Sequence, residues 1–565
     1  MKRTGAQIVW EVLTQEGVEV VFGYPGGAIM PVYDAMLDYR IHHVLVRHEQ
    51  GAAHMADGYA RASGKVGVAL ATSGPGATNL VTGIATAMLD SSPVVCITGQ
   101  VPSKLLGSDA FQETDITGVT LPITKHNFLV TRVEEIAPTL RQAFAIARSG
   151  RPGPVLVDIT KDAQQASLDF VADHEAAAVS RNALPEGLTF ELERALAMID
   201  EAEQPLLLVG QGVIQSGAAA AVRALAEKAD IPVAATLLGL GAFPATHPLS
   251  LGMMGMHGEA WVNHAIQEAD LVVALGMRFD DRVTGDPKTF AAKAKKIHVE
   301  IDRAEIGKTV KCDLNLVADL RTVAARLMEG ARARTRSPWR EKIGAMRASA
   351  ADRDILKRQD DDGRLHAAHV IDELWRATDG RALVVTDVGQ HQMWEAQYYK
   401  HERPRSLVTS GGLGTMGFAL PAAIGARFAR KEDEIWVVVG DGGFQMTACE
   451  LSTCAQEGLK LNVAVINNGF LGMVRQWQEL FYDRRYAATP MLSPDFCKLA
   501  EAHGLSGLRC SERSEVRKTI EAARAHGGTV VVDFRVAAEE NVYPMVPSGG
   551  DIGAMIRRPN NARVA

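Results

Sequence analysis

The sequence predicts an α/β protein built from three doubly wound domains, each with a parallel β-sheet covered by helices on both faces. Short β-branched runs alternate with helical patterns of alanine, leucine and charged residues along the chain. Continuous apolar strands between helices are typical of parallel sheets that are buried on both faces. Many of these strands end in glycine or aspartate, and open α/β sheets bind their ligands at the carboxyl ends of the strands.

The length and the grouping of the strands predict the number of domains. A chain of 565 residues is too long for one hydrophobic core. Two intervals, at about residues 161–203 and 330–364, are interpreted as linkers made of solvated helix and connector. We therefore expect domains at residues 1–185, 186–350 and 351–565.

The expected strands follow from the apolar runs. They are residues 18–23, 94–99 and 154–158 in the first domain, 205–210, 271–276 and 296–301 in the second, and 382–387, 436–440, 462–467 and 529–533 in the third. Residues 66–89 carry no charge and are long enough to span a bilayer. Because Ser73-Gly74-Pro75-Gly76 lies within this stretch, a buried strand, a turn and a buried helix are favoured over a membrane span.

Composition and charge exclude several classes of protein. Hydrophobic residues make up 47% and charged residues 22%, which is typical of globular domains and not of disordered, collagen-like or coiled-coil chains. The net charge is −7 without a basic cluster, so nucleic acid is not an expected partner. No apolar segment follows Met1-Lys2-Arg3, and the six cysteines form no CxxC pair. We expect no membrane association, reduced and buried thiols, and a cytoplasmic location.

Two strand ends in the third domain carry the most specific motif. Residues 436–439 lead into Gly440-Asp441-Gly442-Gly443, and residues 462–466 lead into Asn467-Asn468-Gly469. Neighbouring strand ends thus present a carboxylate and a carboxamide beside glycines that let a ligand approach the backbone. Together with a main-chain carbonyl, these groups form a hard-oxygen set that suits Mg²⁺, with diphosphate oxygens as further ligands.

A second motif places an acid after a strand of the first domain. In Arg47-His48-Glu49-Gln50-Gly51, Glu49 follows an apolar run and is expected to begin a helix. The acid could simply complement the helix dipole. A zinc site with His48 and His54 is disfavoured, because the HExxH spacing requires histidine at position 52, which is Ala52.

The two motifs together resemble those of the thiamine-diphosphate-dependent enzymes. Further segments narrow the resemblance to the catalytic subunits of the acetolactate synthase family, over about residues 4–547. These segments are residues 22–28, 73–79, 110–113 and 411–417. Pyruvate oxidase, oxalyl-CoA decarboxylase and benzoylformate decarboxylase share the GDG motif and the acid, whereas glyoxylate carboligase lacks the acid that is Glu49 here.

The resemblance implies an enzyme, a transferase that joins two keto acids. Pyruvate is decarboxylated on thiamine diphosphate, and the two-carbon unit is joined to pyruvate or 2-ketobutyrate. The products are 2-acetolactate and 2-aceto-2-hydroxybutyrate, which belong to the first common step of valine, leucine and isoleucine biosynthesis. The implied cofactors are thiamine diphosphate, Mg²⁺ and FAD. The alternatives are an FAD-dependent pyruvate oxidase, another carboligase or decarboxylase of this family, and a non-enzymatic thiamine-diphosphate-binding protein.

The resemblance also assigns catalytic roles. Glu49 contacts the pyrimidine ring and moves a proton, which suits a carboxylate, and Met416 supports the bent cofactor. Gln112, Phe111 and Lys161 line the pocket in which the new bond forms. Mg²⁺ is bound by the side chains of Asp441 and Asn468 and by the carbonyl of Phe470.

The expected thiamine-diphosphate contacts come from the first and third domains. They are Tyr24, Pro25, Gly26, Glu49, Thr72, Pro75, Asn79, Val388, Gly389, Gln390, His391, Gly414, Met416, Gly440, Asp441, Gly442, Gly443, Met446, Asn468, Gly472 and Met473.

The middle domain resembles the FAD-binding domain of the biosynthetic members of the family, with FAD in a structural role. Arg278 and Arg282 could instead form a surface cluster with Asp280 and Asp281. The Gly210-Gln211-Gly212 turn does not match GxGxxG and is weak evidence alone. The expected FAD contacts are Arg151, Gly210, Gln211, Gly212, Thr236, Leu237, Gly255, Met256, His257, Gly276, Arg278, Asp280, Arg282, Val283, Glu300, Ile301 and Asp319.

The resemblance further implies substrate contacts and an assembly. Trp477 favours 2-ketobutyrate as the second substrate, and Arg282 binds its carboxylate; Gln112 and Phe111 complete this set. The family places the first domain of one subunit against the third domain of another. We therefore expect a homodimer or homotetramer with active sites at subunit interfaces, with a small regulatory subunit as a further candidate partner.

Overall fold

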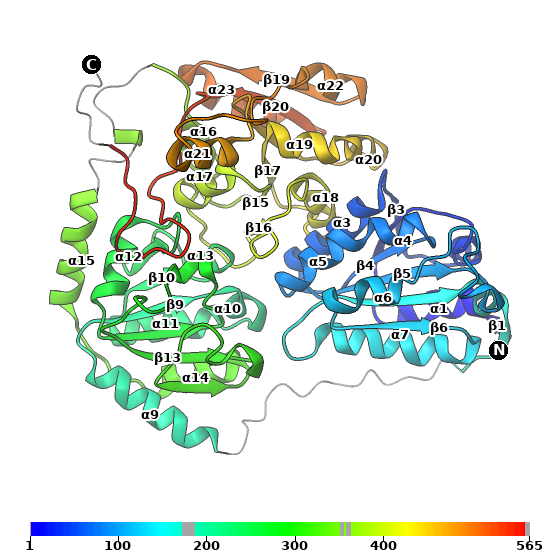
Figure 1. The fold of residues 1–565 in the computed structure, drawn as a ribbon, viewed down its shortest axis with the longest axis horizontal. Helices are drawn as coiled ribbons and strands as arrows, with labels where there is room; N and C mark the ends of the chain where they lie inside the picture. Colours follow the sequence, from blue (N-terminus) through cyan, green and yellow to red (C-terminus); the bar gives the residue numbers. More distant parts are fainter. Residues whose placement is uncertain (1, 172–186, 351–354, 358–362, 560–565) are drawn as a thin grey trace.

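Three parallel six-stranded sheets dominate the computed structural model, which describes residues 2–171, 187–350, 355–357 and 363–559. We call the parts that contain them the N-terminal unit (residues 2–169), the middle unit (residues 188–350) and the C-terminal unit (residues 363–559). They are blue to cyan, green, and yellow to red in Figure 1. The expected α/β class with three parallel sheets is confirmed.

The N-terminal unit has a doubly wound sheet. Its strands lie in the order β3 (His42–Leu45), β2 (Val20–Gly23), β4 (Gly67–Ala71), β5 (Val94–Gln100), β7 (Val155–Thr160) and β6 (His126–Val130). Its helices are α1 (Gly5–Gln15), α2 (Met30–Ala35), α3 (Glu49–Ser63), α4 (Pro75–Asn79), α5 (Val81–Leu89), α6 (Ile116–Thr120), α7 (Val133–Arg148) and α8 (Lys161–Gln165). A separate antiparallel pair joins β1 (Lys2–Thr4) to β8 (Ser167–Asp169).

The C-terminal unit repeats this strand order. Its sheet runs β16 (Leu407–Thr409), β15 (Leu383–Thr386), β17 (Ile435–Gly440), β18 (Asn462–Asn467), β20 (Val530–Arg535) and β19 (Ser506–Cys510). Its helices are α16 (Ala367–Thr378), α17 (Gln390–Tyr398), α18 (Ala419–Ala429), α19 (Asp441–Thr447), α20 (Leu451–Gln456), α21 (Gly472–Phe481), α22 (Phe496–Ala502) and α23 (Val516–Ala525). Counted along the chain, the strand order in both units is 2-1-3-4-6-5. The direction of winding therefore reverses between the first and third strands, which are β2 and β4 in the N-terminal unit and β15 and β17 in the C-terminal unit.

The middle unit has a different order. Its strands run β11 (Ser250–Met253), β10 (Val233–Ala235), β9 (Pro205–Val209), β12 (Leu271–Leu275), β13 (Lys295–Glu300) and β14 (Leu314–Val317). Its helices are α9 (Leu188–Glu201), α10 (Gln211–Ser216), α11 (Ala219–Ala229), α12 (Ala260–Glu268), α13 (Asp281–Thr284), α14 (Leu320–Gly330) and α15 (Ser337–Ala350). Counted along this unit, the order is 3-2-1-4-5-6, the arrangement of the dinucleotide-binding doubly wound folds.

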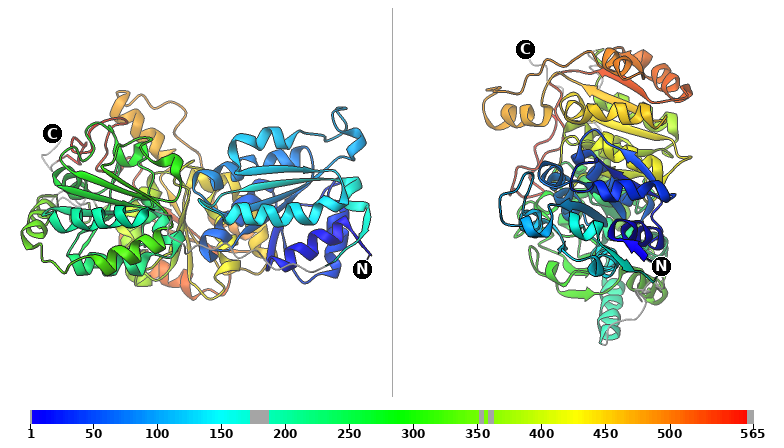
Figure 2. Two further views of the ribbon diagram at one scale, coloured as in Figure 1. Left: turned by 90° about the horizontal axis from the view of Figure 1, so that it is seen from below. Right: turned by 90° about the vertical axis from the view of Figure 1, so that its right-hand side faces the viewer.

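Helices α3 and α18 join the N-terminal and C-terminal units through one hydrophobic core. Buried side chains of both helices, among them Met55, Leu420 and Ile424, belong to this cluster. The helices approach so closely that a Cβ at Gly58 would collide with the Ala422 carbonyl, and one at Gly425 with that of Met55. The middle and N-terminal units form separate lobes in the left view of Figure 2, with parts of the C-terminal unit visible between them.

Most sequence-based expectations for the elements are confirmed. Every expected strand is present within one or two residues, and residues 66–89 form β4, α4 and α5. The linkers contain the expected helices, with α8 and α9 in the first and α15 in the second, but the short strand β8 in the first was not expected. The expected domain boundary at 185/186 lies outside the described residues, and the one at 350/351 lies at their edge.

The cysteines meet the expectation of buried thiols only in part. All six are free; Cys96, Cys454 and Cys510 are buried, and Cys312 and Cys497 are half-buried. The prediction of buried thiols is wrong for Cys449, which is exposed, because it lies in the short turn between α19 and α20.

Candidate active site

A small cavity lies at the point where the sheet of the C-terminal unit reverses direction, between the ends of β15 and β17. It is lined by residues that follow these strands and β18. They are Val388, Gly389, Gln390, His391, Trp394, Met416, Gly440, Asp441, Gly442, Gly443, Ile466, Asn468, Phe470, Leu471, Gly472, Met473 and Val474. Most expected C-terminal contacts of thiamine diphosphate are thus brought together, while Gly414 and Met446 are not among the lining residues. Trp394, Ile466, Leu471 and Val474 were not expected, because as apolar residues they carry no chemical signal.

The three expected metal ligands all lie in this cavity. Asp441 begins α19 and is almost fully buried, and burial raises the pKa of its carboxyl group. The Ser493 hydroxyl donates a 2.8 Å hydrogen bond to one of its oxygens. The Asn468 amide donates to Gln390 Oε1 and accepts from the Phe470 N–H at 3.1 Å. A carboxylate, an amide and a nearby main-chain carbonyl fit the oxygen preference of Mg²⁺.

The cavity also has features that fit a phosphate-bearing cofactor. His391 is buried, its pKa is lowered to about 3 by burial, and its Nε2 atom has no hydrogen-bond partner in the described structure. A Cβ at Gly472 would collide with the Gln390 side chain and lie 2.7 Å from Asn468 Nδ2. The turn at Gly389 opens α17, so helix N–H groups face a site for an anion. Glycine at position 472 lets the Gln390 and Asn468 side chains pack directly against the backbone.

A loop of residues 410–417 carries Met416 to the cavity. It connects β16 to α18. The buried carboxylate of Asp387 accepts hydrogen bonds from the N–H groups of Gly417 and Ala419, each at 3.0 Å. Burial raises the pKa of Asp387 to about 6. Asp387 was recognised only as the end of a strand, although it fixes the start of α18.

In the N-terminal unit the expected residues form a second group, around Glu49. Glu49 is the first residue of α3, is 9% exposed and accepts a 2.9 Å hydrogen bond from Asn79 Nδ2. Pro75 begins α4, which contains Asn79. Thr72 follows β4, and a Cβ on Gly26 would lie 2.7 Å from its hydroxyl. This group follows the strands β3 and β4, and it places an acid beside an amide.

The other expected residues of the N-terminal unit surround this group. Tyr24 and Phe111 are exposed, Phe111 by 88%. Gln112 has a left-handed backbone (φ 59°), and a Cβ at Gly74 would lie 2.8 Å from its carbonyl. Lys161 begins α8, which is tied to the loop after β2 by a hydrogen bond from the Gln164 amide to the Ala28 carbonyl. The segment with Phe111 is shaped by Glu113, which accepts hydrogen bonds from the N–H groups of Gly107 and Ala110.

The two groups do not share a cavity within the single chain. The cavity beside Asp441 is lined only by residues of the C-terminal unit and has a volume of about 60 Å³. Pockets that enclose a small organic ligand have volumes of roughly 300–1,000 Å³. Trp477 contacts Phe481 on α21, with ring centroids 5.2 Å apart, and is not among the lining residues. The Asp441 group and the Glu49 group therefore lie at separate places in the single chain.

Part of the expected FAD site lies at the reversal point of the middle sheet, between β9 and β12. Gly210 and Gly212 follow β9, and Gly276 follows β12. A Cβ at Gly210 would collide with the Gly276 carbonyl, so these turns require glycine. Gln211 begins α10, and Thr236 and Leu237 follow β10. The strand order and the glycines fit a dinucleotide at this edge.

A second group of expected FAD residues surrounds Arg282. The Met256 N–H donates a 2.7 Å hydrogen bond to the Arg282 carbonyl, and a Cβ on Gly255 would collide with that oxygen. His257 is buried against the Pro544 carbonyl, and its pKa is lowered to about 4 by burial. Arg278 lies 3.9 Å from Asp280, which caps α13 by accepting hydrogen bonds from the N–H groups of Arg282 and Val283. The alternative interpretation as a charge cluster is partly correct, because Arg282 also lies 3.6 Å from Asp281.

The remaining expected FAD residues make other contacts. Glu300 is buried at the end of β13 and accepts from the N–H groups of Ile301 and Asp302. Asp319 caps α14. Arg151 pairs with Glu305 at 2.9 Å, which ties the N-terminal unit to the middle unit.

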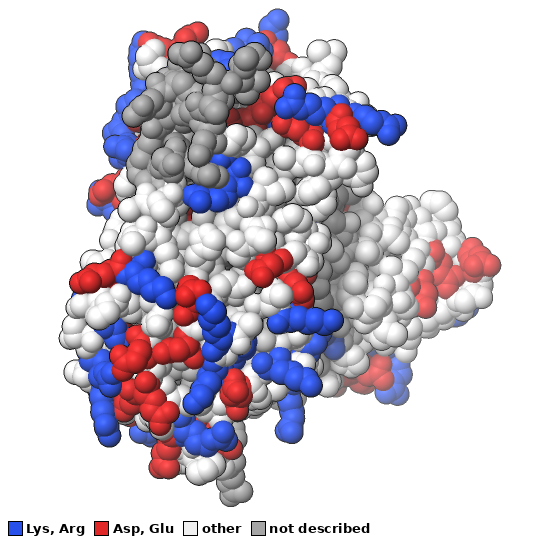
Figure 3. All heavy atoms as spheres, turned by 60° about the vertical axis from the view of Figure 1, so that its left-hand side comes forward, with Lys and Arg blue, Asp and Glu red and all other residues white. Residues whose placement is uncertain are grey.

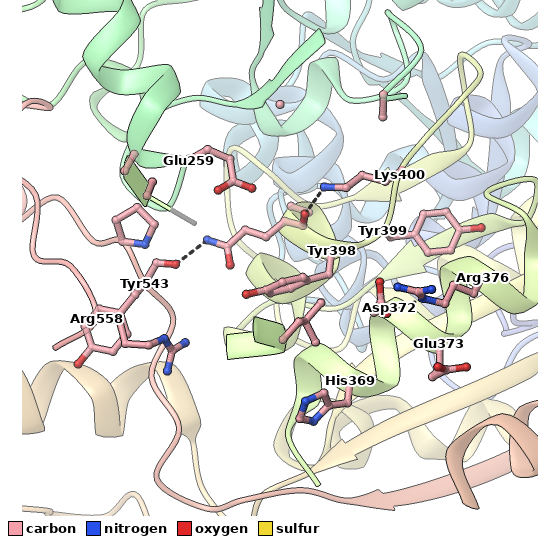
Figure 4. A pocket seen from close by; sticks show the side chains of 18 of the residues that line it. Glu259, His369, Asp372, Glu373, Arg376, Tyr398, Tyr399, Lys400, Tyr543 and Arg558 are labelled. Atoms are coloured by element: carbon pink, nitrogen blue, oxygen red, sulfur yellow. Dashed lines mark hydrogen bonds and ion pairs between the residues drawn. The ribbon is translucent and has the colours of Figure 1, made fainter. Parts of the chain in front are cut away.

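Another cavity, larger than the one beside Asp441, has none of the expected site residues among the described residues that line it. It measures about 1,170 Å³ and lies between the middle and C-terminal units. Figure 4 shows Glu259 on one side of it, with Tyr398, Lys400 and Arg376 on the other. Ala350, Leu356 and Gly363 in its wall adjoin residues that lie outside the described part of the chain.

The surface carries mixed charge. On the face in Figure 3, lysine and arginine side chains alternate with aspartate and glutamate over the lower part of the view, without forming one basic patch. Among the described residues, no helix combines the length and the apolar character that crossing a bilayer requires.

Comparison with known proteins identifies the family of the chain. Three family models match: the N-terminal TPP-binding domain of thiamine pyrophosphate enzymes at residues 3–119, their central domain at residues 192–327 and their C-terminal TPP-binding domain at residues 387–534. The match to an acetolactate synthase of Mycobacterium bovis has 49% identity and covers 97% of this chain and 90% of that protein. The acetolactate synthase large subunit of Corynebacterium glutamicum is 48% identical, over 97% of this chain and 89% of that one.

An archaeal relative extends the comparison. A probable acetolactate synthase large subunit of Methanocaldococcus jannaschii is 44% identical over 98% of this chain and 95% of its own length. These relatives match all three units, and the family models cover both groups of site residues. The chain therefore belongs to the thiamine-diphosphate-dependent enzymes, and within them to the acetolactate synthase large-subunit family.

Proposed function

We propose that this chain joins two 2-keto acids with loss of one carboxyl group as CO₂. Two molecules of pyruvate and one proton give 2-acetolactate and CO₂; with 2-ketobutyrate as the second substrate, the product is 2-aceto-2-hydroxybutyrate. The observation that carries this proposal is that one chain contains both a buried acid, Glu49, and the Asp441–Asn468 group, and that this chain matches acetolactate synthases over nearly its whole length.

The residues of the C-terminal unit would hold the cofactor and its metal. Asp441, Asn468 and the Phe470 carbonyl would bind Mg²⁺, and the turn at Gly389 would meet the diphosphate. Bound thiamine diphosphate supplies a nucleophilic ring carbon and an electron sink for the decarboxylation. The protein supplies orientation, exclusion of water and proton transfer.

Glu49 and its neighbours would control the proton. A carboxylate at a helix N-terminus can accept a proton from a bound ring and return it, and a positioned group of this kind is worth about 10²–10⁴-fold in rate. The Asn79 amide fixes one oxygen of Glu49, so the other remains for the ligand. Met416 would press against the cofactor, which suits a flexible apolar side chain.

The second substrate would be bound by residues from several segments. Gln112, Phe111 and Lys161 of the N-terminal unit, Arg282 of the middle unit and Trp477 of the C-terminal unit are the proposed contacts. Arginine suits this task because its planar cation matches a carboxylate. These side chains lie apart in the single chain and would meet only when the site is complete.

FAD would occupy the reversal point of the middle sheet in a structural role. The strand order, the turns at Gly210 and Gly276, and the buried Glu300 support this proposal. The expected limits of the middle domain, residues 186–350, enclose these elements, and we keep the three expected domains as part of the proposal.

The complete site would lie between two copies of the chain. The cavity beside Asp441 is too small to enclose the cofactor, and Phe111 is exposed. A second copy would supply the wall that contains Glu49, in a homodimer or homotetramer. A regulatory subunit remains a candidate partner, and a cytoplasmic location remains a prediction from the sequence.

One reaction tests the proposal. The purified chain is incubated with pyruvate, thiamine diphosphate, Mg²⁺ and FAD, without oxygen or another electron acceptor. We expect one acetolactate and one CO₂ for every two pyruvates consumed. Reduction of FAD without acetolactate would instead support a pyruvate oxidase, and cofactor binding without CO₂ release would support a non-enzymatic role. A parallel reaction without FAD tests the middle unit.

A further inference from the structure

The loop of residues 410–417 belongs to the C-terminal unit, but residues of the N-terminal unit also bind it. The carboxylate of Asp90, at the end of α5, accepts hydrogen bonds from the Gly411 N–H at 3.0 Å and the Gly412 N–H at 2.6 Å. Asp90 is 1% exposed. Hydrogen bonds from neighbouring N–H groups to one ionised carboxylate are strong and fix the orientation of the peptide.

A buried arginine holds Asp90 in place. Arg61 of α3 contacts Asp90 at 2.9 Å and makes two hydrogen bonds to Asp57, one turn earlier on the same helix. Its remaining terminal nitrogen donates a 2.6 Å hydrogen bond to the Thr409 carbonyl, at the start of the loop. The guanidinium also lies over the Phe418 ring, 5.1 Å from its centroid. Arg61 thus contacts both ends of the loop while it orients Asp90.

A third contact lies next to Met416. The Thr86 hydroxyl of α5 lies 2.7 Å from the Thr415 hydroxyl, and both side chains are buried. The Thr415 N–H in turn donates to the Ser410 hydroxyl. Gly417 has a left-handed backbone (φ 87°), so the chain turns sharply after Met416. The N-terminal unit therefore fixes the loop at its beginning and next to Met416.

We propose that Asp90, oriented by Arg61, and Thr86 are positioning residues for the loop of residues 410–417 and through it for Met416. Asp90 does not line the cavity beside Asp441 and acts only through the backbone of the loop. The inference rests on the proposed function only for the role of Met416 as a cofactor support. The N-terminal unit thus shapes the cofactor cavity of its own chain, besides providing Glu49.

The test compares Asp90→Asn with a matched control, Asp57→Asn. Both variants remove a buried carboxylate that pairs with Arg61, but Asp57 makes no hydrogen bond to the loop among the described contacts. The first measurement is amide hydrogen exchange of the full chain without added ligands. We expect exchange at Gly411 and Gly412 to be about tenfold faster in Asp90→Asn, as for loss of one charge-assisted hydrogen bond. In Asp57→Asn it should remain as in the wild type.

The second measurement is the affinity of the full chain for thiamine diphosphate with Mg²⁺, together with kcat and KM for pyruvate. We expect Asp90→Asn to weaken cofactor binding and to lower kcat by about tenfold each, with a smaller change in the KM for pyruvate. Asp57→Asn should stay within about twofold in both, even if its melting temperature falls equally. Equal effects of the two variants would overturn the proposal, because they would show a structural role only.

A third variant covers the case in which Asp90→Asn does not fold. Thr86→Val keeps the ionic cluster and the side-chain volume but removes the hydrogen bond to Thr415. Faster exchange in the loop and weaker cofactor binding would support the proposal, and wild-type values would overturn it. The exchange measurement needs no substrate, so it remains decisive if the wild-type chain fails to convert pyruvate and the proposed function is wrong.

Discussion

The N-terminal and C-terminal units share one strand order but use the same edge of the sheet for different chemistry. In both, the chain reverses between the first and third strands. In the N-terminal unit, helix α3 follows β3, the second strand of its sheet in chain order, and begins with Glu49. In the C-terminal unit, the corresponding helix α18 follows the loop that carries Met416. The C-terminal unit alone has a carboxylate and an amide at the ends of its third and fourth strands, at Asp441 and Asn468. The topology sets where ligands bind, and the side chains decide what is bound.

The N-terminal and C-terminal units each provide a carboxylate that binds backbone N–H groups of the other unit, close to an expected site residue. Glu450 of the C-terminal unit accepts hydrogen bonds from the N–H groups of Arg47 and His48, just before Glu49. Asp90 of the N-terminal unit does the same for Gly411 and Gly412. The two units are therefore not independent modules, and a change in one should be felt in the site residues of the other.

The largest effect is expected at the acid of the N-terminal unit. Glu49→Gln keeps the shape and the hydrogen bond to Asn79 but cannot take up a proton. We expect kcat to fall by about 10²–10⁴-fold with an unchanged melting temperature, measured by acetolactate formation and thermal unfolding. Glu19→Gln is the control, because Glu19 is exposed and pairs with Lys65. An activity of Glu49→Gln equal to that of the control would contradict the proposed role.

Mixing two inactive variants tests whether the two units work across a subunit interface. Glu49→Ala damages one group and Asp441→Ala the other, so each homodimer would have no intact site. After subunit exchange, half of the dimers would be mixed and would carry one intact site, and about a quarter of the wild-type activity should return. No recovery, despite exchange shown by native mass spectrometry, would place both groups of one site in the same chain.

The sheets of the N-terminal and C-terminal units also carry an aspartate at the same position of corresponding strands, β7 and β20. The surroundings of these two aspartates differ. Asp158 of β7 accepts hydrogen bonds from the neutral Thr98 and Gln100, whereas Asp533 of β20 is paired with Arg509 and Arg535. Burial raises the pKa of Asp158 to about 7. The folded state therefore holds this proton more tightly than the unfolded state. The contribution is favourable at low pH and is lost as the pH rises from about 4 to about 7.

Asp158→Asn should remove this pH dependence. Between pH 5 and pH 7 we expect the wild type to lose about 2 kcal/mol of unfolding free energy through this one group. The variant should lose correspondingly less, as measured by urea unfolding at several pH values. Asp533→Asn is the matched comparison, and it should not flatten the profile in this range. Equal pH profiles of the Asp158→Asn variant and the wild type would contradict the role given to burial.

The sequence pattern predicts the central strands of the sheets but few of their edge strands. Strands such as β9, β12 and β17 are fully or almost fully buried and appear as continuous apolar runs. The edge strands β6 and β19 are partly exposed, so their patterns are mixed and they were not predicted. The three-residue strands β10 and β16 are too short to form a pattern at all.

For the site, the sequence indicated residues that meet a ligand but not those that hold them. Asp441, Asn468 and Glu49 follow strands and were expected. Asp90 and Glu450 were not, because each acts on a segment more than 300 positions away in the sequence. A buried carboxylate that accepts backbone N–H groups has no local sequence pattern, and only the packing of α3 against α18 brings these partners together.

The smallest effect is expected for the contact from the C-terminal unit to Glu49. Glu450→Gln keeps the side-chain volume and the hydrogen bond from Thr453, but it weakens acceptance from the Arg47 and His48 N–H groups. Because Glu49 follows directly, its carboxylate should lose its fixed position, and kcat should fall by about tenfold, as for one charge-assisted hydrogen bond. Glu457→Gln is the matched control, since Glu457 also links the two units, through His42 at 2.8 Å, but away from Glu49. If Glu450→Gln changes the melting temperature and leaves kcat at the control value, the contact holds the units together without orienting the acid.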